Sequence, residues 1–171
     1  MSGLPLLSLL IALPLAAGVL CLLVGARAAR WIALIATLSV LEIAVELWLN
    51  FAPGGAQWQF TEFLPLGGGV NWALGIDGIA LLLIVLTAFL MPICIGASWR
   101  SIDRRVPEYM AYFLLMEALI MGSFAAQDLF LFYIFFEGGL IPMYLIIGIW
   151  GGAEKIKASY KFFPTPSSAR C

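Results

Sequence analysis

The chain has 171 residues, of which 63% are hydrophobic and 11% are charged, with a net charge of −1 and a mean hydropathy of +1.04. A soluble domain carries about 45–50% apolar and about 25% charged residues. The composition therefore excludes a water-soluble domain and predicts an integral membrane protein, and the near-neutral charge gives no indication of a nucleic-acid partner.

The chain is also poor in the residues that hold cofactors. It contains no histidine, which removes histidine-ligated haem, most zinc sites and Ser-His-Asp catalysis. Cys21, Cys94 and Cys171 form no CxxC pair, and two of them lie in apolar runs, where a thiol packs as a small hydrophobic group. We therefore predict no metal ligand and no cofactor-binding residue in this chain.

Five apolar runs follow one another along the sequence. A helix needs about 20 apolar residues to cross a bilayer, and runs of about this length occupy residues 4–24, 31–51, 74–98, 109–126 and 128–150. The first run has no preceding Lys or Arg and is too long for a signal peptide, so we interpret it as a retained span. Residues 52–73 form the one long loop, which is rich in glycine and aromatic residues. The predicted fold class is an all-α, polytopic transmembrane helix bundle.

Basic residues alternate between the loops. Lys and Arg occur in the segments 25–30, 99–107 and 153–161, whereas residues 52–73 contain neither. Positively charged loops stay in the cytoplasm. We therefore expect a multi-pass protein of the bacterial inner (plasma) membrane, rather than the mitochondrial inner membrane, with its N-terminus outside.

The stretch FYIFFEGGLIPMY places one acid, Glu137, in an apolar run. Glu137 lies nine residues into the fifth predicted span, about 14 Å deep and near the midplane of a hydrocarbon core about 30 Å thick. An ionisable residue at that depth is a functional-site hypothesis by default. The alternative is a protonated structural Glu that forms a hydrogen bond with a neighbouring helix.

A proton-carrying role for Glu137 is supported by three residues that follow it in the sequence, Gly138, Gly139 and Pro142. Pro142 has no N–H, so the carbonyl of Gly138 loses its helical hydrogen bond. Gly138 and Gly139 leave room for a neighbouring helix or for water. A carboxyl, a free carbonyl and a small space that water can enter suit a proton carrier, although glycine and proline also serve as packing residues in membrane helices.

The sequence around the other acidic residues gives weaker indications of a functional site. Glu117 lies at nearly the same depth in the fourth predicted span and is the candidate for a second carboxyl; the sequence leaves open whether it faces Glu137. Glu42 and Glu46 share one helix face and indicate a surface packed on protein. Asp77 and Asp128 are placed to cap the N-termini of the third and fifth spans.

The stretches LGIDGIALLLIVLTAFLMPICI, DLFLFYIFFEGGLIPMYLIIGIWGG and KIKASYKFF resemble chain M of the proton-translocating NADH:quinone oxidoreductase, respiratory complex I, whose mitochondrial homologue is subunit 4. The resemblance implies an antiporter-like fold of about fourteen helices, with Glu137 as the essential glutamate of helix five, which pairs with a lysine on helix seven. It also implies that FMN, iron–sulfur clusters and quinone belong to other subunits. The implied partners are the other membrane-arm subunits and the lipid bilayer.

The C-terminal residues depart from this pattern. Residues 154–163 resemble the start of a sixth helix, but PTPSSARC cannot continue it, since Pro164 and Pro166 break a helix. We therefore expect residues 1–163 to be the N-terminal part of the antiporter-like domain and 164–171 a polar tail outside the family, as from a truncated or frameshifted gene. Two alternatives to a proton-translocating oxidoreductase subunit remain, namely a sodium/proton antiporter subunit of the same fold and an inactive structural membrane fragment.

Overall fold

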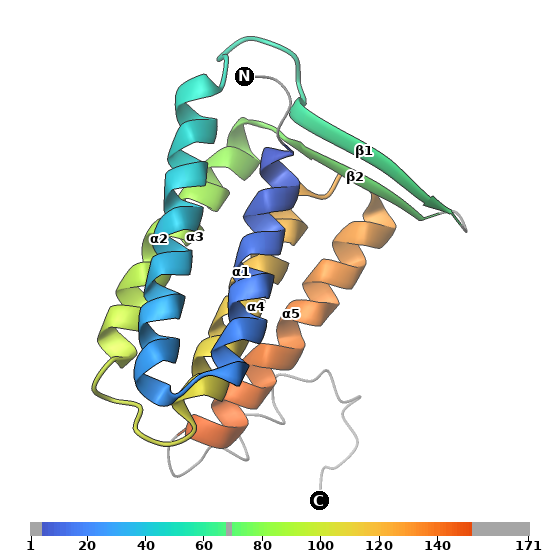
Figure 1. Cartoon of the computed structure of the whole chain (residues 1–171). Helices are drawn as coiled ribbons and strands as arrows, with labels where there is room; N and C mark the ends of the chain where they lie inside the picture. Colours follow the sequence, from blue (N-terminus) through green and yellow to red (C-terminus); the bar gives the residue numbers. More distant parts are fainter. Residues whose placement is uncertain (1–4, 68–69, 152–171) are drawn as a thin grey trace, which may run out of the picture.

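The computed structural model describes residues 5–67 and 70–151 (Figure 1). The predicted start of a sixth helix and the polar tail lie outside this part. The described elements are five helices and one two-stranded sheet: α1 (Leu6–Leu23), α2 (Ala26–Asn50), β1 (Gln59–Gly67), β2 (Val70–Ile76), α3 (Gly78–Ser98), α4 (Val106–Ala125) and α5 (Leu129–Trp150). All five helices are long and apolar enough to cross a membrane, which confirms the five predicted spans.

Two of the helix starts are fixed by aspartate caps, as the sequence predicts. The side chain of Asp77 accepts a hydrogen bond from the backbone N–H of Ala80 at 2.7 Å, and that of Asp128 accepts one from Phe130 N at 2.7 Å. Each bond satisfies an N–H that has no partner within the helix. These caps confirm Asp77 and Asp128 as the residues that begin the two helices.

The third span starts later than predicted. Residues 74–76 belong to β2, and α3 begins at Gly78. The predicted loop 52–73 likewise contains an antiparallel hairpin, in which Phe63 pairs with Ala73 and Leu64 with Trp72. Hydropathy predicts neither strand, because it does not distinguish a buried strand from the start of an apolar helix. A glycine run between two segments with aromatic residues was the available signal.

The helices form a bundle in which successive members run antiparallel, with the hairpin across one end (Figure 1). Within the described part, α4 contacts every other helix and also β2, whereas α5 contacts only α4 and β2. Two clusters of buried apolar residues fill the interior, one nearer the hairpin and one nearer the opposite end. The centre of the bundle is thus α4, and α2 and α5 lie on opposite sides of it without touching.

The hairpin holds the start of α1. Helix α1 has no side-chain cap of its own. The carboxylate of Glu62 instead accepts hydrogen bonds from Leu7 N at 2.8 Å, from Ser8 N at 3.0 Å and from the Ser8 hydroxyl. Trp72 Nε1 donates to the same hydroxyl at 3.0 Å. A carboxylate from β1 therefore supplies the missing N-cap, in the position where negative charge stabilises a helix dipole.

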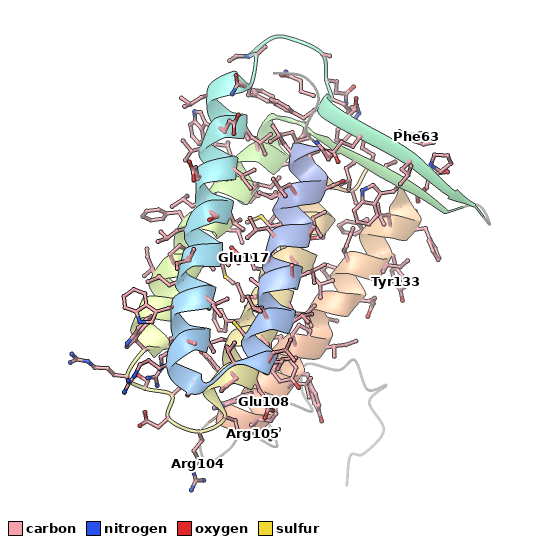
Figure 2. All side chains as sticks on the ribbon, in the orientation of Figure 1. Phe63, Arg104, Arg105, Glu108, Glu117 and Tyr133 are labelled. Atoms are coloured by element: carbon pink, nitrogen blue, oxygen red, sulfur yellow. The ribbon has the colours of Figure 1, made fainter. Side chains whose placement is uncertain are left out.

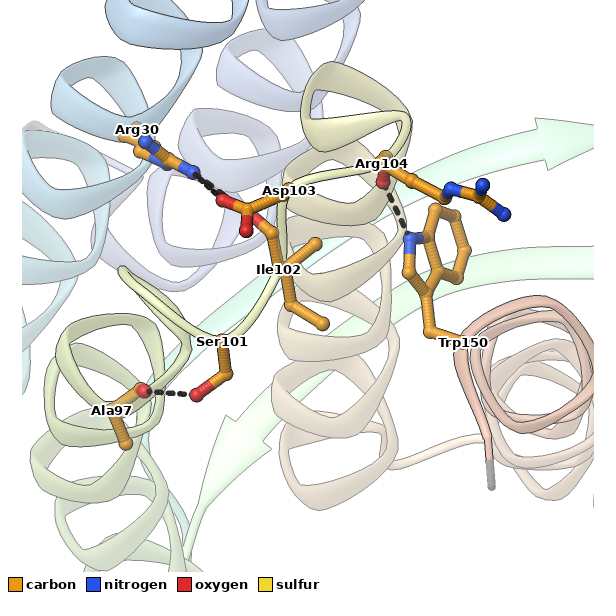
Figure 3. Close-up of polar contacts among 7 residues, drawn as sticks. All are labelled: Arg30, Ala97, Ser101, Ile102, Asp103, Arg104 and Trp150. Atoms are coloured by element: carbon orange, nitrogen blue, oxygen red, sulfur yellow. Dashed lines mark hydrogen bonds and ion pairs between the residues drawn. The ribbon is translucent and has the colours of Figure 1, made fainter. Parts of the chain in front are cut away.

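The opposite end of the bundle carries the loop between α3 and α4 (Figure 3). A guanidinium nitrogen of Arg30, Nη2, donates to the carbonyl of Ile102 at 2.7 Å and lies 3.7 Å from the carboxylate of Asp103. Trp150 Nε1 donates to the carbonyl of Arg104 at 2.8 Å. Side chains from α2 and α5 thus hold this basic loop at the ends of the helices.

Candidate proton-carrying site

Helix α5 presents two different faces. Phe135 and Pro142 are buried, whereas Glu137 is exposed on the surface of the described chain. At about 100° per residue, Glu137 lies about 200° round the helix from Phe135, so the face that packs on α4 turns the carboxyl outward. The neighbouring large side chains on the outer face, Tyr133, Phe136 and Ile141, are 58%, 53% and 58% exposed.

Phe135 fixes how closely α5 approaches α4. An ideal Cβ on Gly122 of α4 would lie 2.7 Å from Phe135 Cδ1, a separation that atoms do not tolerate. The ring also makes an edge contact with Trp72 of β2, with centroids 5.8 Å apart. Because Gly122 has no side chain, Phe135 packs between α4 and the hairpin. The contact between Phe135 and Gly122 sets the rotation of α5 about its axis, and in this rotation Glu137 points outward.

The two glycines after Glu137 face α4 as well. An ideal Cβ on Gly138 would meet Leu119 Cδ2 at 3.4 Å, and one on Gly139 would meet Leu119 Cβ at 3.9 Å. Both separations are ordinary van der Waals contacts, so the space beside the glycines is occupied by a leucine side chain. Helix α5 runs through the buried Pro142 without interruption, and proline cannot donate to the carbonyl of Gly138.

Glu117 lies in the centre of the bundle (Figure 2). Its side chain is 0% exposed, and neither carboxyl oxygen has a hydrogen-bond partner. It shares a stripe of α4 with Met110, Leu114 and Met121, which are also 0% exposed. Burying a carboxyl in an apolar enclosure of this kind is costly, because no protein group replaces the hydration of its oxygens.

The two glutamates have the same depth but different directions. Glu117 lies eight residues before the last residue of α4, and Glu137 lies eight residues after the first residue of α5. The residues of α4 that meet α5, Leu119 and Gly122, lie about 140–200° round the helix from Glu117. Glu117 therefore points away from α5 into the interior of the bundle, and the two carboxyls form no pair.

The remaining acids complete the chemistry of the described residues. Glu42 and Glu46 are exposed along α2, and Glu62 caps α1, a role that sequence reasoning missed because it treated residues 52–73 as a loop. No group of three or more His, Cys, Asp or Glu residues is close enough to bind a metal in the described ranges 5–67 and 70–151. This arrangement offers exposed carboxyls on two spanning helices, at Glu137 on α5 and at Glu42 on α2, and one enclosed carboxyl at Glu117 on α4.

Comparison with known proteins agrees with this architecture. Residues 8–127 match the family model described as NADH-ubiquinone oxidoreductase chain 4, amino terminus. The chain belongs to the chain 4 family of NADH:quinone oxidoreductase. Residues 126–169 match a second model from the same group of proteins, described as NADH:quinone oxidoreductase/Mrp antiporter.

Individual relatives of the chain 4 family support the assignment. NADH-quinone oxidoreductase subunit M of Rhodobacter capsulatus is 47% identical over 165 residues, which cover 92% of this chain and 32% of that protein. NADH-ubiquinone oxidoreductase chain 4 of Arabidopsis thaliana is 45% identical over 141 residues, covering 80% of this chain and 28% of that protein. The chain thus spans about a third of the length of the curated relatives it matches.

Solved structures show the same fold. A chain of respiratory complex I from Thermus thermophilus aligns with a TM-score of 0.75 at 30% identity, over 90% of this chain and 31% of that one. A chain of an archaeal membrane-bound sulfane sulfur reductase aligns with a TM-score of 0.73 at 24% identity, over 93% of this chain and 33% of that one, which shows a common fold alone. The chain is therefore a multi-pass membrane protein with the antiporter-like arrangement of helices.

Proposed function

We propose that this chain forms the N-terminal helices of a proton-translocating membrane subunit of NADH:quinone oxidoreductase, and that Glu137 binds and releases the proton. The observation that carries the proposal is the chain 4 family match over residues 8–127, followed directly by a helix with an ionisable side chain near its centre. The chain itself carries no redox cofactor in this proposal; FMN, iron–sulfur clusters and quinone belong to partner subunits.

The exposure of Glu137 supports this role. A carboxyl in the hydrocarbon region faces the bundle interior or a hydrated cavity of the whole protein, and Glu137 points out of the described helices. No Lys or Arg occurs between residues 106 and 150. The group that balances an ionised Glu137 therefore comes from a helix packed against the outer face of α5. Approach or withdrawal of that cation would decide whether the carboxyl releases or takes up a proton.

Glu117 has a different part in this proposal. It is enclosed by apolar side chains and lacks a hydrogen-bond partner, so proton exchange there requires a change in the packing of α4 or entry of water. We propose Glu117 as a second carboxyl that holds a proton between transfers, with Glu137 as the group that meets the rest of the pathway.

The test uses the full-length subunit in its assembled complex. We expect Glu137→Gln to preserve assembly and NADH oxidation with an artificial acceptor, because the amide retains the shape of the side chain. Quinone-linked NADH oxidation and proton pumping should fall at least tenfold. The matched control is Glu108→Gln, which removes a carboxyl of α4 that pairs with Arg105 near the loop and should pump normally. Undiminished pumping by the assembled Glu137→Gln complex would refute the proposal.

A sodium/proton antiporter subunit is the second candidate, since the family model that matches residues 126–169 covers both kinds of protein. In the oxidoreductase, proton movement is driven by electron transfer from NADH to quinone, whereas in the antiporter it is driven by exchange with sodium. If pumping by the purified complex requires NADH and quinone and is unchanged when sodium is removed, the oxidoreductase function holds. Sodium-dependent proton exchange in the absence of NADH would establish the antiporter instead.

We further propose that the membrane is the bacterial inner membrane and that the hairpin end of the bundle lies outside. The support is the clustering of Arg27, Arg30, Arg100, Arg104 and Arg105 at the opposite end. Single cysteines at the exposed positions Gln57 and Ser101 should react with an impermeant maleimide from opposite sides, Gln57 from outside the cell. The reverse pattern would invert the orientation.

A further inference from the structure

One outer face of the bundle, on α2, carries acids where lipid would be expected. Between the two ends of α2, exposed residues recur at helical spacing along one stripe, and this stripe consists of Trp31, Ile35, Leu38, Glu42, Val45, Glu46 and Leu49. We call this set the α2 acidic face. The opposite side of the same helix, from Ala29 to Leu47, is buried against the bundle. Glu42 stands within a stripe that is otherwise apolar, apart from Glu46 one turn further on.

Two exposed tryptophans give the depth of Glu42. Trp31 and Trp48 are 54% and 48% exposed, and tryptophan side chains settle at the two membrane interfaces. Glu42 lies 11 residues from Trp31 and six from Trp48, which is about 16 Å and about 9 Å along the helix. A Glu side chain is too short to reach the interface over that distance, whereas Glu46 is only about 3 Å from the level of Trp48.

Helix α3 provides a comparison on the same flank of the bundle. Its exposed large side chains are all apolar, and they are Ile79, Leu82, Leu83, Leu86, Phe89, Leu90 and Ile93. Such a face is compatible with lipid tails. The acidic face of α2 is not, because an acid in the hydrocarbon region is costly unless another protein group pairs with it. The contrast between adjacent helices indicates that α2, and not α3, is covered by protein.

The described helices cannot supply the pairing group. No Lys or Arg occurs between residues 31 and 99 or between 106 and 150, and the nearest basic residue along α2, Arg30, is about 18 Å away along the helix axis. Helix α5, the last described element, lies on the other side of the bundle and does not contact α2. The partner therefore approaches from outside the flank that α2 and α3 form.

We infer that the α2 acidic face is a docking surface for a transmembrane helix of a neighbouring membrane subunit, which places a Lys or Arg side chain against Glu42. A basic side chain is the complement of two carboxylates on successive turns of one helix face. Apolar residues at Ile35, Leu38 and Leu49 supply the surrounding packing surface. This interface is distinct from the proton-carrying site, since Glu137 faces the opposite flank.

Cross-linking in the assembled complex tests the inference. The complex contains a full-length subunit with the substitution Leu38→Cys, which leaves Glu42 in place. This cysteine is labelled with a benzophenone maleimide, and the complex is then irradiated. We expect adducts with one other membrane subunit. The control is Leu86→Cys on α3, a position that is 53% exposed. Leu86 lies eight residues from the hairpin end of α3, and Glu42 lies eight residues from the hairpin end of α2, so the two positions have similar depths. We expect the control to give adducts with lipid. Adducts of position 38 with lipid or with its own chain would overturn the inference.

Charge exchange tests the predicted chemistry. We expect Glu42→Lys to reduce the yield of assembled complex at least tenfold, whereas Glu42→Gln should retain half of it or more. Exchanging the basic residue at the cross-linked position of the partner for Glu should restore the Glu42→Lys complex to at least half the normal yield. Failure of every such exchange, with normal membrane insertion of the variant, would show that no cation faces Glu42. Loss of pumping by Glu137→Gln would be unaffected, so the two proposals fail separately.

Discussion

Glu117 lies eight residues before the last residue of α4 and Glu137 eight residues after the first residue of α5, yet the two carboxyls have different surroundings. Glu117 is enclosed in the centre of the bundle without a hydrogen-bond partner, and Glu137 is exposed on an outer face. Residue type and depth are the same, so the difference comes from the contacts of the two helices. Depth makes an acid in a membrane unusual, but its direction decides whether another group can reach it.

The contact that sets this difference is Phe135 on Gly122, and enlarging Gly122 should disturb it most. Extra methylenes in a packed interior cost about 1–3 kcal/mol, and we expect Gly122→Leu to destabilise the subunit by about 3 kcal/mol. The measurement is the unfolding midpoint of the purified protein in detergent. Gly96→Leu on α3 is the control, since an added Cβ there meets nothing within 4 Å. Equal effects at both sites would contradict the described packing of α4 on α5.

The enclosure of Glu117 predicts that its carboxyl lowers stability. Removal of a buried polar group without a partner recovers about 1–3 kcal/mol, so Glu117→Met should raise the unfolding free energy by about 2 kcal/mol. Glu137→Met, on the exposed face, should give no comparable gain in the isolated subunit. If Glu117→Met were instead destabilising, the Glu117 carboxyl would have a hydrogen-bond partner. The surroundings of Glu117 and Glu137 would then differ less than described.

Trp72 connects the hairpin to both sides of the bundle, through its hydrogen bond to Ser8 and its ring contact with Phe135. Trp72→Phe keeps an aromatic ring near Phe135 and removes the N–H donor. We expect a loss of about 1 kcal/mol, the net value of one hydrogen bond. Ser8→Ala should cost about 2 kcal/mol alone, because its hydroxyl also donates to Glu62, and adding Trp72→Phe to it should cost little more. Additive losses would show that the two side chains do not act through the same bond.

Gly138 should tolerate an added side-chain carbon, which Gly122 does not. An added Cβ at position 138 makes an ordinary contact with Leu119 at 3.4 Å, and alanine favours a helix over glycine by about 1 kcal/mol. We expect Gly138→Ala to leave stability unchanged or to raise it by less than about 1 kcal/mol. A marked loss of proton pumping with unchanged stability would indicate that the small residue beside Glu137 serves water entry rather than helix packing.

Some features of the fold were accessible from sequence because they depend on local chemistry. Apolar runs of about 20 residues have no other stable arrangement than spanning helices, and the five spans are confirmed. The caps at Asp77 and Asp128 were also predicted, since a carboxylate followed by an apolar run satisfies the free N–H groups of a helix start. The depths of Glu117 and Glu137 followed from counting residues from the turn.

The sequence by itself thus determined the membrane class, the number of spans and the position of each acid along its helix, because these depend on residue order alone. Only the tertiary structure decided the rotation of each helix, which depends on contacts between residues far apart in the chain. The Phe135–Gly122 contact turns Glu137 outward, and the pairing of β1 with β2 brings Glu62 to the start of α1. No local pattern contains that information, since each contact joins two segments whose sequences are independent.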